Sequence, residues 1–319
     1  MIAVVGKPNV TLKRLMVEDG FPHLSNYTSR GRSVTQELDG VFNCSYTLTQ
    51  LRDYILRRWS WVQDDLPIIN KVLVPNKLKA QQKMYDKGLH DHILVHNETG
   101  ISEYDLSRDP NGWLLKPYNS QGGRGIKIYE GERVRSGFYL QKNAKKFREF
   151  RAHVGLWLEN PVFTIQEKKP KPELFDDLIG DPDYYFWPIE EVEVREALPV
   201  TWNIESGFYF RRSTTPENRE EKANRYPLFA RIEELAIKAV AAIGYQFGAV
   251  DILMDEDRQL WVIEVNSHPA IKNEESKRIY KIALEPLKEI NKMDLFNLTQ
   301  QTSRRLTSRT FVRGEGFVE

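Results

Sequence analysis

One stretch decides the fold, residues 248–269, which reads Gly248-Ala-Val-Asp-Ile-Leu-Met-Asp-Glu-Asp-Arg-Gln-Leu-Trp-Val-Ile-Glu-Val-Asn-Ser-His-Pro269. Two short apolar runs, 249–254 and 260–265, flank the polar turn 255–259. This pattern predicts a β-hairpin with a longer loop. Successive side chains of a strand point to opposite faces, so Glu264 and Asn266 point the same way.

The polar end of this hairpin predicts a metal site. If Asp251 pairs across from Glu264, three oxygen-bearing side chains converge on one spot: Asp251, Glu264 and Asn266. Hard oxygen ligands suit Mg²⁺, which keeps some waters and shares its remaining positions with substrate phosphates. The alternative is a buried strand that ends in solvated carboxylates.

A glycine-rich segment, residues 112–129, provides a second signal. A strand over 113–115 delivers Lys116, and a second strand is expected over 126–129. The loop between them contains Ser120, Gln121, Gly122, Gly123, Arg124 and Gly125. Glycines let backbone N–H groups approach a polyphosphate, and a lysine adds a positive charge there. The spacing matches neither a P-loop nor GxGxxG, so a tight hairpin turn is the alternative.

Together these motifs resemble the ATP-grasp superfamily. They are Lys116-Pro, the glycine-rich loop, and the pattern Phe-Gly-x-x-Asp251-Ile-Leu followed by Glu264-Val-Asn266-x-x-Pro. Within it they are similar to the RimK-like glutamate ligases and the YheC/YheD-type proteins. The resemblance implies an α+β (α/β) fold with two lobes gripping ATP. It also implies an ATP- and Mg²⁺-dependent carboxylate–amine ligase working through an acyl-phosphate, with Mn²⁺ as the other candidate ion.

The resemblance also implies residue roles. Lys77, in Asn-Lys-Leu, matches a helix-opening lysine that reaches the nucleotide phosphates, and a solvated helix lysine is the alternative. The backbone of Leu140 and Gln141 matches the hinge that reads adenine. Asn203 lies in a loose match to a polar segment near the metal or phosphates.

The stretch 147–154 resembles the family's Asp-x-Arg strand, with Glu149 in place of the aspartate. Alternation puts Glu149, Arg151 and His153 on one face. Arg151 would bind the γ-phosphate or the acyl-phosphate, because its planar fork suits phosphate oxygens. Arg151 and Lys116 are the catalytic candidates, whereas His153 is expected to be structural. A strand with a solvated polar face is the alternative.

The resemblance covers about residues 70–293 and implies four regions. They are a shortened N-terminal lobe (1–74), a central lid lobe with the glycine-rich loop (75–140), a C-terminal lobe with the metal site (141–293) and a tail (294–319). Helices are expected over 77–88, 228–242 and 273–292. Residues 166–199 fit the family poorly, and we expect an insertion there, with a loop over 168–172.

Composition limits the remaining choices. Lysine plus arginine (46) and aspartate plus glutamate (45) nearly cancel, so neither a nucleic-acid nor a membrane partner is expected. Cys44 is the one cysteine, which excludes an intrachain disulfide and fits a reducing, cytoplasmic location. No apolar run approaches a membrane span.

Two rival functions stay open, a small-molecule kinase of the same superfamily and a non-catalytic ATP-binding protein. Neither the carboxylate nor the amine (amino acid, peptide or protein terminus) can be named, and the oligomeric state is open.

Overall fold

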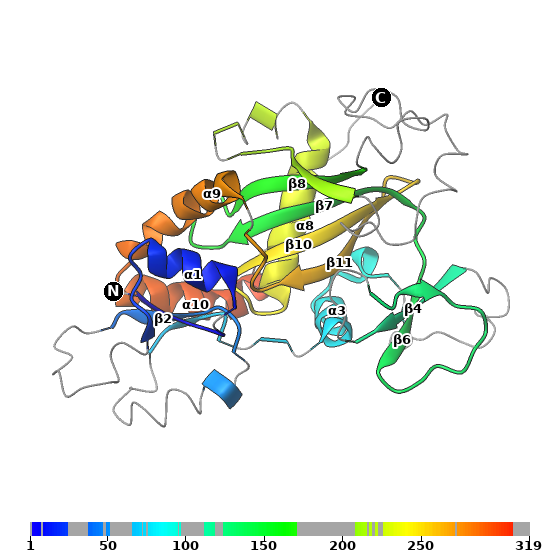
Figure 1. Cartoon of the computed structure of the whole chain (residues 1–319), viewed down its shortest axis with the longest axis horizontal. Coiled ribbons are helices and arrows are strands. Elements are labelled where there is room, and N and C mark those ends of the chain that lie inside the picture. Colours follow the sequence, from blue (N-terminus) through cyan, green and yellow to red (C-terminus); the bar gives the residue numbers. More distant parts are fainter. Residues whose placement is uncertain are drawn as a thin grey trace.

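The computed structural model is described here over fifteen segments of the chain. They are residues 2–7, 9–24, 38–46, 49–51, 66–71, 73–74, 76–94, 96, 112–118, 124–170, 208–215, 217–218, 221–222, 226–271 and 273–308. Within them the strands form three sheets, and helices pack between and over the sheets (Figure 1).

A small parallel sheet, in the order β1-β2-β3, lies in the expected N-terminal lobe. Its strands are β1 (Ile2–Val5), β2 (Gly40–Asn43) and β3 (Ile68–Ile69), with helix α1 (Thr11–Glu18) after β1. The last described helix, α10 (Lys292–Ser308), packs against this sheet through Leu295, which is buried. Gly40 permits this contact, because a Cβ atom there would lie 2.1 Å from Leu295 Cδ2.

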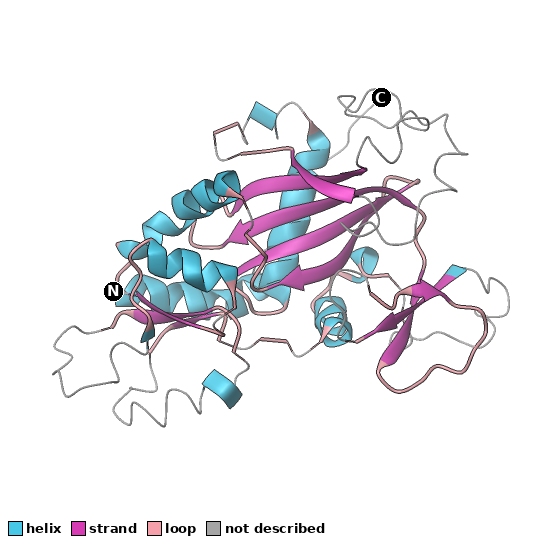
Figure 2. Ribbon diagram, viewed as in Figure 1, coloured by secondary structure: helices cyan, strands magenta, loops and turns pink. Residues whose placement is uncertain are grey.

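A five-stranded antiparallel sheet, the large sheet, forms the centre of the molecule, in the order β11-β10-β7-β8-β9 (Figure 2). Its strands are β7 (Lys146–Gly155), β8 (Val162–Pro170), β9 (Phe208–Arg212), β10 (Phe247–Asp255) and β11 (Leu260–Asn266). The predicted hairpin is confirmed as β10 and β11, which pair antiparallel.

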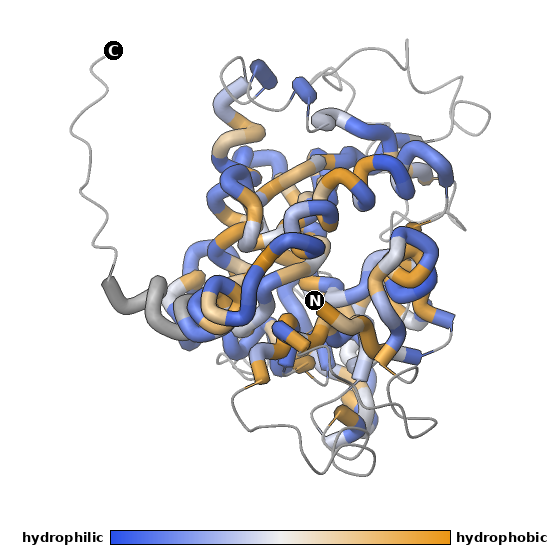
Figure 3. Tube along the Cα trace, turned by 90° about the vertical axis from the view of Figure 1, so that its left-hand side faces the viewer, coloured by the Kyte–Doolittle hydropathy of each residue, from blue (hydrophilic) through white to orange (hydrophobic). Residues whose placement is uncertain are grey.

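Helix α8 (Pro227–Ala242) covers one face of the large sheet. Its residues Ile232, Ala236 and Ala239 are buried against the alternate side chains Phe150 and Ile252 of β7 and β10. Hydrophobic and hydrophilic stretches are interspersed along the backbone trace (Figure 3). On β7 the residues Phe150, Ala152 and Val154 belong to this core, whereas their neighbours Arg151 and His153 do not. Helix α8 ends just before Gly244, as expected, and this glycine has a φ of 82°. On the other face of the large sheet, Phe163 and Phe247 belong to a second hydrophobic cluster. The charged part of that face, which bears Arg151, Asp251 and Glu264, is called the site face below.

A second small sheet, in the order β5-β4-β6, lies on the far side of helix α3 (Lys77–Asp86) from β11 (Figure 1). Its strands are β4 (Trp113–Pro117), β5 (Lys127–Ile128) and β6 (Phe138–Lys142). The predicted helix at 77–88 is confirmed, with Asn76 as its N-cap: the side chain accepts from the Lys79 N–H at 2.9 Å. A 3-10 turn, His90–His92, follows.

Asn70 joins the N-terminal lobe to the large sheet. It adopts a left-handed backbone conformation, with φ of 54°, at the end of β3. Its Oδ1 accepts from the Gln246 N–H (2.9 Å) and the Phe247 N–H (3.1 Å), and its Nδ2 donates to the Phe247 carbonyl (2.9 Å). Asn70 thus satisfies the backbone at the start of β10, although it is fully buried.

Three expectations need correction or comment. Residues 168–170 are not a loop, because they end β8 and pair with β9, Pro170 opposite Phe208. The helix expected over 273–292 is two pieces, α9 (Glu274–Leu284) and the 3-10 turn Glu285–Lys288, since Pro286 interrupts it. The interval expected as a tail begins as α10, which continues to Ser308.

None of the helices in the described part of the chain combines the length and apolarity that a bilayer span requires.

Candidate functional site

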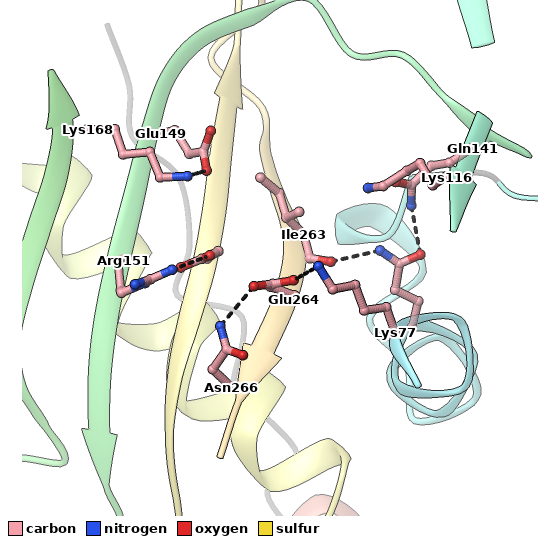
Figure 4. Close-up of polar contacts among 11 residues, drawn as sticks. Lys77, Lys116, Gln141, Glu149, Arg151, Lys168, Ile263, Glu264 and Asn266 are labelled. Carbon is pink, nitrogen blue, oxygen red and sulfur yellow. Dashed lines mark hydrogen bonds and ion pairs between the residues drawn. The ribbon is translucent and has the colours of Figure 1, made fainter. Parts of the chain in front are cut away.

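The structure brings together the three expected metal ligands on the site face. Asp251 and Glu264 are direct cross-strand neighbours of β10 and β11, and Asn266 lies opposite Ala249. The Asn266 Nδ2 donates to Glu264 Oε1 at 2.8 Å (Figure 4). Directly opposed residues of antiparallel strands have Cβ atoms about 5 Å apart, so the three oxygen-bearing side chains share one small region.

Arg151 reaches this region from β7, where it is the cross-strand neighbour of Asp251. Its Nε and Nη2 donate to Asp251 Oδ1 (2.6 Å) and Oδ2 (2.8 Å), a two-pronged ion pair. Burial opposes the charge of the guanidinium, but Asp251 outweighs it, so the pKa of Arg151 lies above its ordinary value. The guanidinium carbon lies over the ring of Phe210 of β9, 4.3 Å from the ring centroid, a cation–π contact.

Lys77 reaches the same region from the first position of α3. It forms an ion pair with Glu264 (Figure 4). Burial raises the pKa of Glu264, but Lys77 and the Asn266 hydrogen bond reverse the effect, so the pKa of this carboxyl lies below its usual value. The N-cap at Asn76 fixes where the helix begins, and therefore where Lys77 leaves it.

Lys116, from the second small sheet, is 6% exposed, and its ammonium donates to Gln141 Oε1 at 2.7 Å. Burial, helped by the positive charge of Lys77 and opposed by Glu264, lowers the pKa of Lys116 to about 8. An ammonium ion shielded from water is costly. Such a lysine is suited to receive a phosphate.

Two further lysines complete the cationic side of the site. Lys146 Nζ lies 3.1 Å from Glu149 Oε2, and Lys168 also pairs with Glu149. Burial lowers the pKa of Lys146, whereas Glu149 and Asp251 raise it. Among the residues that the structure describes, the site face and its surroundings therefore hold five cations (Lys77, Lys116, Lys146, Arg151, Lys168) and three carboxylates (Glu149, Asp251, Glu264).

Sequence reasoning missed Lys146 and Lys168. Strict alternation along β7 would place the side chains of Lys146 and Glu149 on opposite faces of the sheet. However, the register with β10 shifts here: Met254 pairs with Arg148, and the next residue, Asp255, pairs with Lys146. A bulge of this kind re-aims a side chain. Lys168 was expected in a loop. Recognising that β8 continues to Pro170 would have placed Lys168 on the same face as residues 164 and 166.

His153 lies beside these charges but is fully engaged. Its Nε2 donates to Gln166 Oε1 (2.9 Å), and its Nδ1 accepts from the Tyr280 hydroxyl (2.5 Å). Burial lowers the pKa of His153 to about 4, so the imidazole is neutral at pH 7. A structural role for His153 remains our prediction.

The other expected site residues fall into two groups. Ser120, Gln121, Gly122, Gly123 and Asn203 lie outside the described residues. Four are described. Arg124 and Gly125 lie in a turn before β5, where Gly125 has φ of 76°. Leu140 and Gln141 lie in β6, paired with Leu115 and Leu114 of β4.

The donor set fits a hard divalent cation. Asp251, Glu264 and Asn266 supply two carboxylates and one amide oxygen. Among the described residues no group of three or more histidine, cysteine, aspartate or glutamate side chains could hold a metal by itself. Mg²⁺ usually takes one or two carboxylates and completes its shell with waters and phosphates. Arg151 and Lys77 now neutralise the two carboxylates, and phosphate oxygens would offer both cations other partners.

Comparison with known proteins places this arrangement in context. Residues 210–290 match the model of the RimK-like ATP-grasp domain. The fold is similar to the structure of the ATP-grasp ligase PsnB complexed with precursor peptide PsnA2 and AMPPNP (TM-score 0.51, 12% identity, covering 94% of this chain and 98% of that one). It is also similar to PsnB complexed with a phosphomimetic variant of minimal precursor, Mg and ADP (TM-score 0.50, 11% identity, 95% and 98% covered). No curated protein sequence matches the chain.

These comparisons confirm the expected fold class and the resemblance to ATP-grasp proteins. The chain has the α+β ATP-grasp fold, and its residues 210–290 are similar to the RimK-like domain. The matched interval contains β10 and β11 with Asp251, Glu264 and Asn266.

Proposed function

We propose that this chain is an ATP- and Mg²⁺-dependent ligase that joins a carboxylate to an amine through an acyl-phosphate. The observation that carries the proposal is the charge balance of the site: five cations surround three carboxylates, and two of those carboxylates are direct neighbours. An excess of buried and half-buried cations is costly without an anion. A magnesium triphosphate supplies both the anion for the lysines and arginine and the cation for Asp251 and Glu264.

Magnesium ligands would come from Asp251, Glu264 and Asn266, and the ion would neutralise phosphate oxygens. Lys77 and Lys116 lie on the side of α3 and the second small sheet, and would hold the triphosphate from there. Arg151 lies on β7 and would hold the phosphoryl group as it is transferred. Positioning and charge neutralisation are what phosphoryl transfer requires from a protein.

The proposed ligase reaction consists of two displacement steps. A substrate carboxylate oxygen attacks the γ-phosphorus, and the bond to the ADP oxygen breaks. The amine nitrogen then attacks the acyl carbon, the bond to the phosphate oxygen breaks, and the nitrogen loses a proton. Arg151 and Lys116 would stabilise the charge that spreads over the phosphoryl oxygens in the first step.

The experiment is an ADP-release assay with pooled carboxylates and amines, including amino acids and peptides. We expect carboxylate-dependent ADP release, a hydroxamate when hydroxylamine replaces the amine, and an amide product by mass spectrometry. Asp251→Asn and Glu264→Gln should each lower turnover by more than about 100-fold, the usual scale for losing charge stabilisation. Asp257→Asn, in the exposed turn between β10 and β11, is the matched control.

A phosphorylated hydroxyl product with no amide would instead identify a kinase. Full turnover by both carboxylate variants would contradict the assigned site.

A further inference from the structure

A chain of three hydrogen bonds connects Lys116 to the large sheet. Lys116 Nζ donates to Gln141 Oε1 (2.7 Å), Gln141 Nε2 donates to Gln81 Oε1 (2.7 Å), and Gln81 Nε2 donates to the Ile263 carbonyl (2.9 Å) (Figure 4). It passes from the second small sheet through α3 to β11. The three side chains are 6%, 1% and 0% exposed, so water cannot replace these bonds.

The two ends of the chain fix the direction of every bond. A backbone carbonyl only accepts, so the amide nitrogen of Gln81 must face Ile263. An ammonium group only donates, so the amide oxygen of Gln141 must face Lys116. The middle bond then runs from Gln141 to Gln81. Reversing either amide would place two donors or two acceptors together.

At the Ile263 end, this series of hydrogen bonds is anchored at a β-bulge. On β11, Glu264 pairs with Asp251 and Val262 pairs with Ile252, so Ile263 is the extra residue. A bulge leaves its extra residue unpaired in the strand ladder. The Ile263 carbonyl therefore needs a partner, and Gln81 supplies it. The next residue is Glu264, a proposed metal ligand.

At the other end of the series of hydrogen bonds, burial disfavours the positive charge of the Lys116 ammonium. Lys116 has its pKa lowered by burial, with Lys77 and Lys146 acting in the same direction and Glu264 and Glu149 opposing them. In this setting a correctly oriented acceptor matters more than it does in water. Gln141 provides that acceptor only while Gln81 holds its other end.

We propose that Gln81 is a positioning residue: through Gln141 it holds the Lys116 ammonium at the nucleotide site and ties it to the bulge beside Glu264. This inference rests on the proposed function, since it assigns Gln81 to the same nucleotide site. It gives α3 a second part in that site besides Lys77, and it couples the two sheets on either side of α3 through one polar chain.

The test is a double-mutant cycle on nucleotide affinity. The dissociation constant of Mg²⁺·AMPPNP is measured by calorimetry for the wild type, Gln81→Met, Lys116→Met and the double variant. We expect Gln81→Met to weaken binding about 10-fold and Lys116→Met about 100-fold, the scale of a lost hydrogen bond and a lost charged one. The double variant should match Lys116→Met within about 2-fold, because residues in one network do not act additively.

Gln82→Met is the matched control, since Gln82 is the next residue of α3 and its side chain donates to Asp86 of the same helix at 2.7 Å. It should leave the affinity unchanged. If Gln81→Met does not fold, Gln81→Asn replaces it in the cycle: the amide is uncharged but one methylene shorter, so it cannot bond to both Gln141 and Ile263. Its loss of affinity should again vanish without Lys116.

Equal weakening by the Gln81 variant with and without Lys116 would overturn the inference alone, because that result describes a structural residue. Wild-type affinity in Lys116→Met would overturn the inference together with the assignment of Lys116 to the nucleotide.

Discussion

The two faces of the large sheet use the same strands in opposite ways. On β7, Phe150 points into the core beneath α8, while its neighbour Arg151 points to the site face and pairs with Asp251. The core face is mainly hydrophobic, and two buried charged residues on it, Arg148 and Glu167, pair with each other. The site face is charged: among its described residues, three cations and three carboxylates lie on the sheet itself, and Lys77 and Lys116 add two cations from the neighbouring elements. We therefore expect the residues under α8 to contribute mainly to stability and the charged residues of the site face mainly to ligand binding.

We expect the largest difference in folding stability between alanine variants of two phenylalanines, one on each face of the large sheet. Phe150→Ala removes a fully buried ring and should lower the free energy of unfolding by about 3–5 kcal/mol. Phe210→Ala removes a half-buried ring that packs on Arg151. It should cost under about 2 kcal/mol of stability and weaken nucleotide binding by a few-fold. Urea unfolding and calorimetry measure both quantities. An equal loss of stability in the two variants would contradict the contrast.

A smaller effect concerns His153, which lies on the site face but is buried like a core residue. Its pKa falls from 6.5 in the unfolded chain to about 4 in the fold, so the unfolded state binds more protons between those values. Stability should therefore be lost as the pH falls from 6.5 to about 4, by on the order of 3 kcal/mol from this group.

His153→Gln should remove that part of the acid sensitivity, because glutamine does not titrate. Urea unfolding of both proteins at several pH values gives the difference, and other titrating groups cancel in the comparison. Parallel pH profiles for the two proteins would refute the assignment of His153 as a neutral buried group.

The smallest effect compares two helix caps. Asn76 caps α3 and Asn273 caps α9, each accepting from a backbone N–H, at 2.9 and 2.8 Å. Each change to alanine should cost about 1 kcal/mol of stability. Only Asn76→Ala should also weaken nucleotide binding, about 2- to 5-fold, since a frayed first turn misplaces Lys77. Thermal unfolding and calorimetry check this pair, and equal affinities would count against the role of Lys77.

Much of the fold could be predicted from local sequence. The hairpin of β10 and β11 follows from its apolar runs, and alternation places Glu264 and Asn266 on one face. Helix α8 follows from its apolar periodicity. The position of α10 could not be predicted in this way. Its residue Leu295 packs against Gly40, which lies 255 positions earlier in the sequence.

The site could be predicted only in part. The candidates Asp251, Glu264, Arg151 and Lys77 do come together, but their pairings depend on which strands are neighbours. Arg151 and Asp251 are 100 residues apart and meet because β7 lies beside β10. Gln81 could not be singled out, because α3 has a weak apolar stripe and its glutamines look like solvated residues. Its burial follows from the packing of α3 on β11.

We expect the site face to bind a magnesium triphosphate. The most direct measurement is calorimetric binding of ATP with and without Mg²⁺, to the wild type and to Glu264→Gln. We predict that wild-type affinity falls at least about 10-fold when Mg²⁺ is removed. In Glu264→Gln we expect this dependence on Mg²⁺ to be largely lost. Absence of ATP binding by the folded wild-type protein, or an unchanged Mg²⁺ dependence in the variant, would contradict the account.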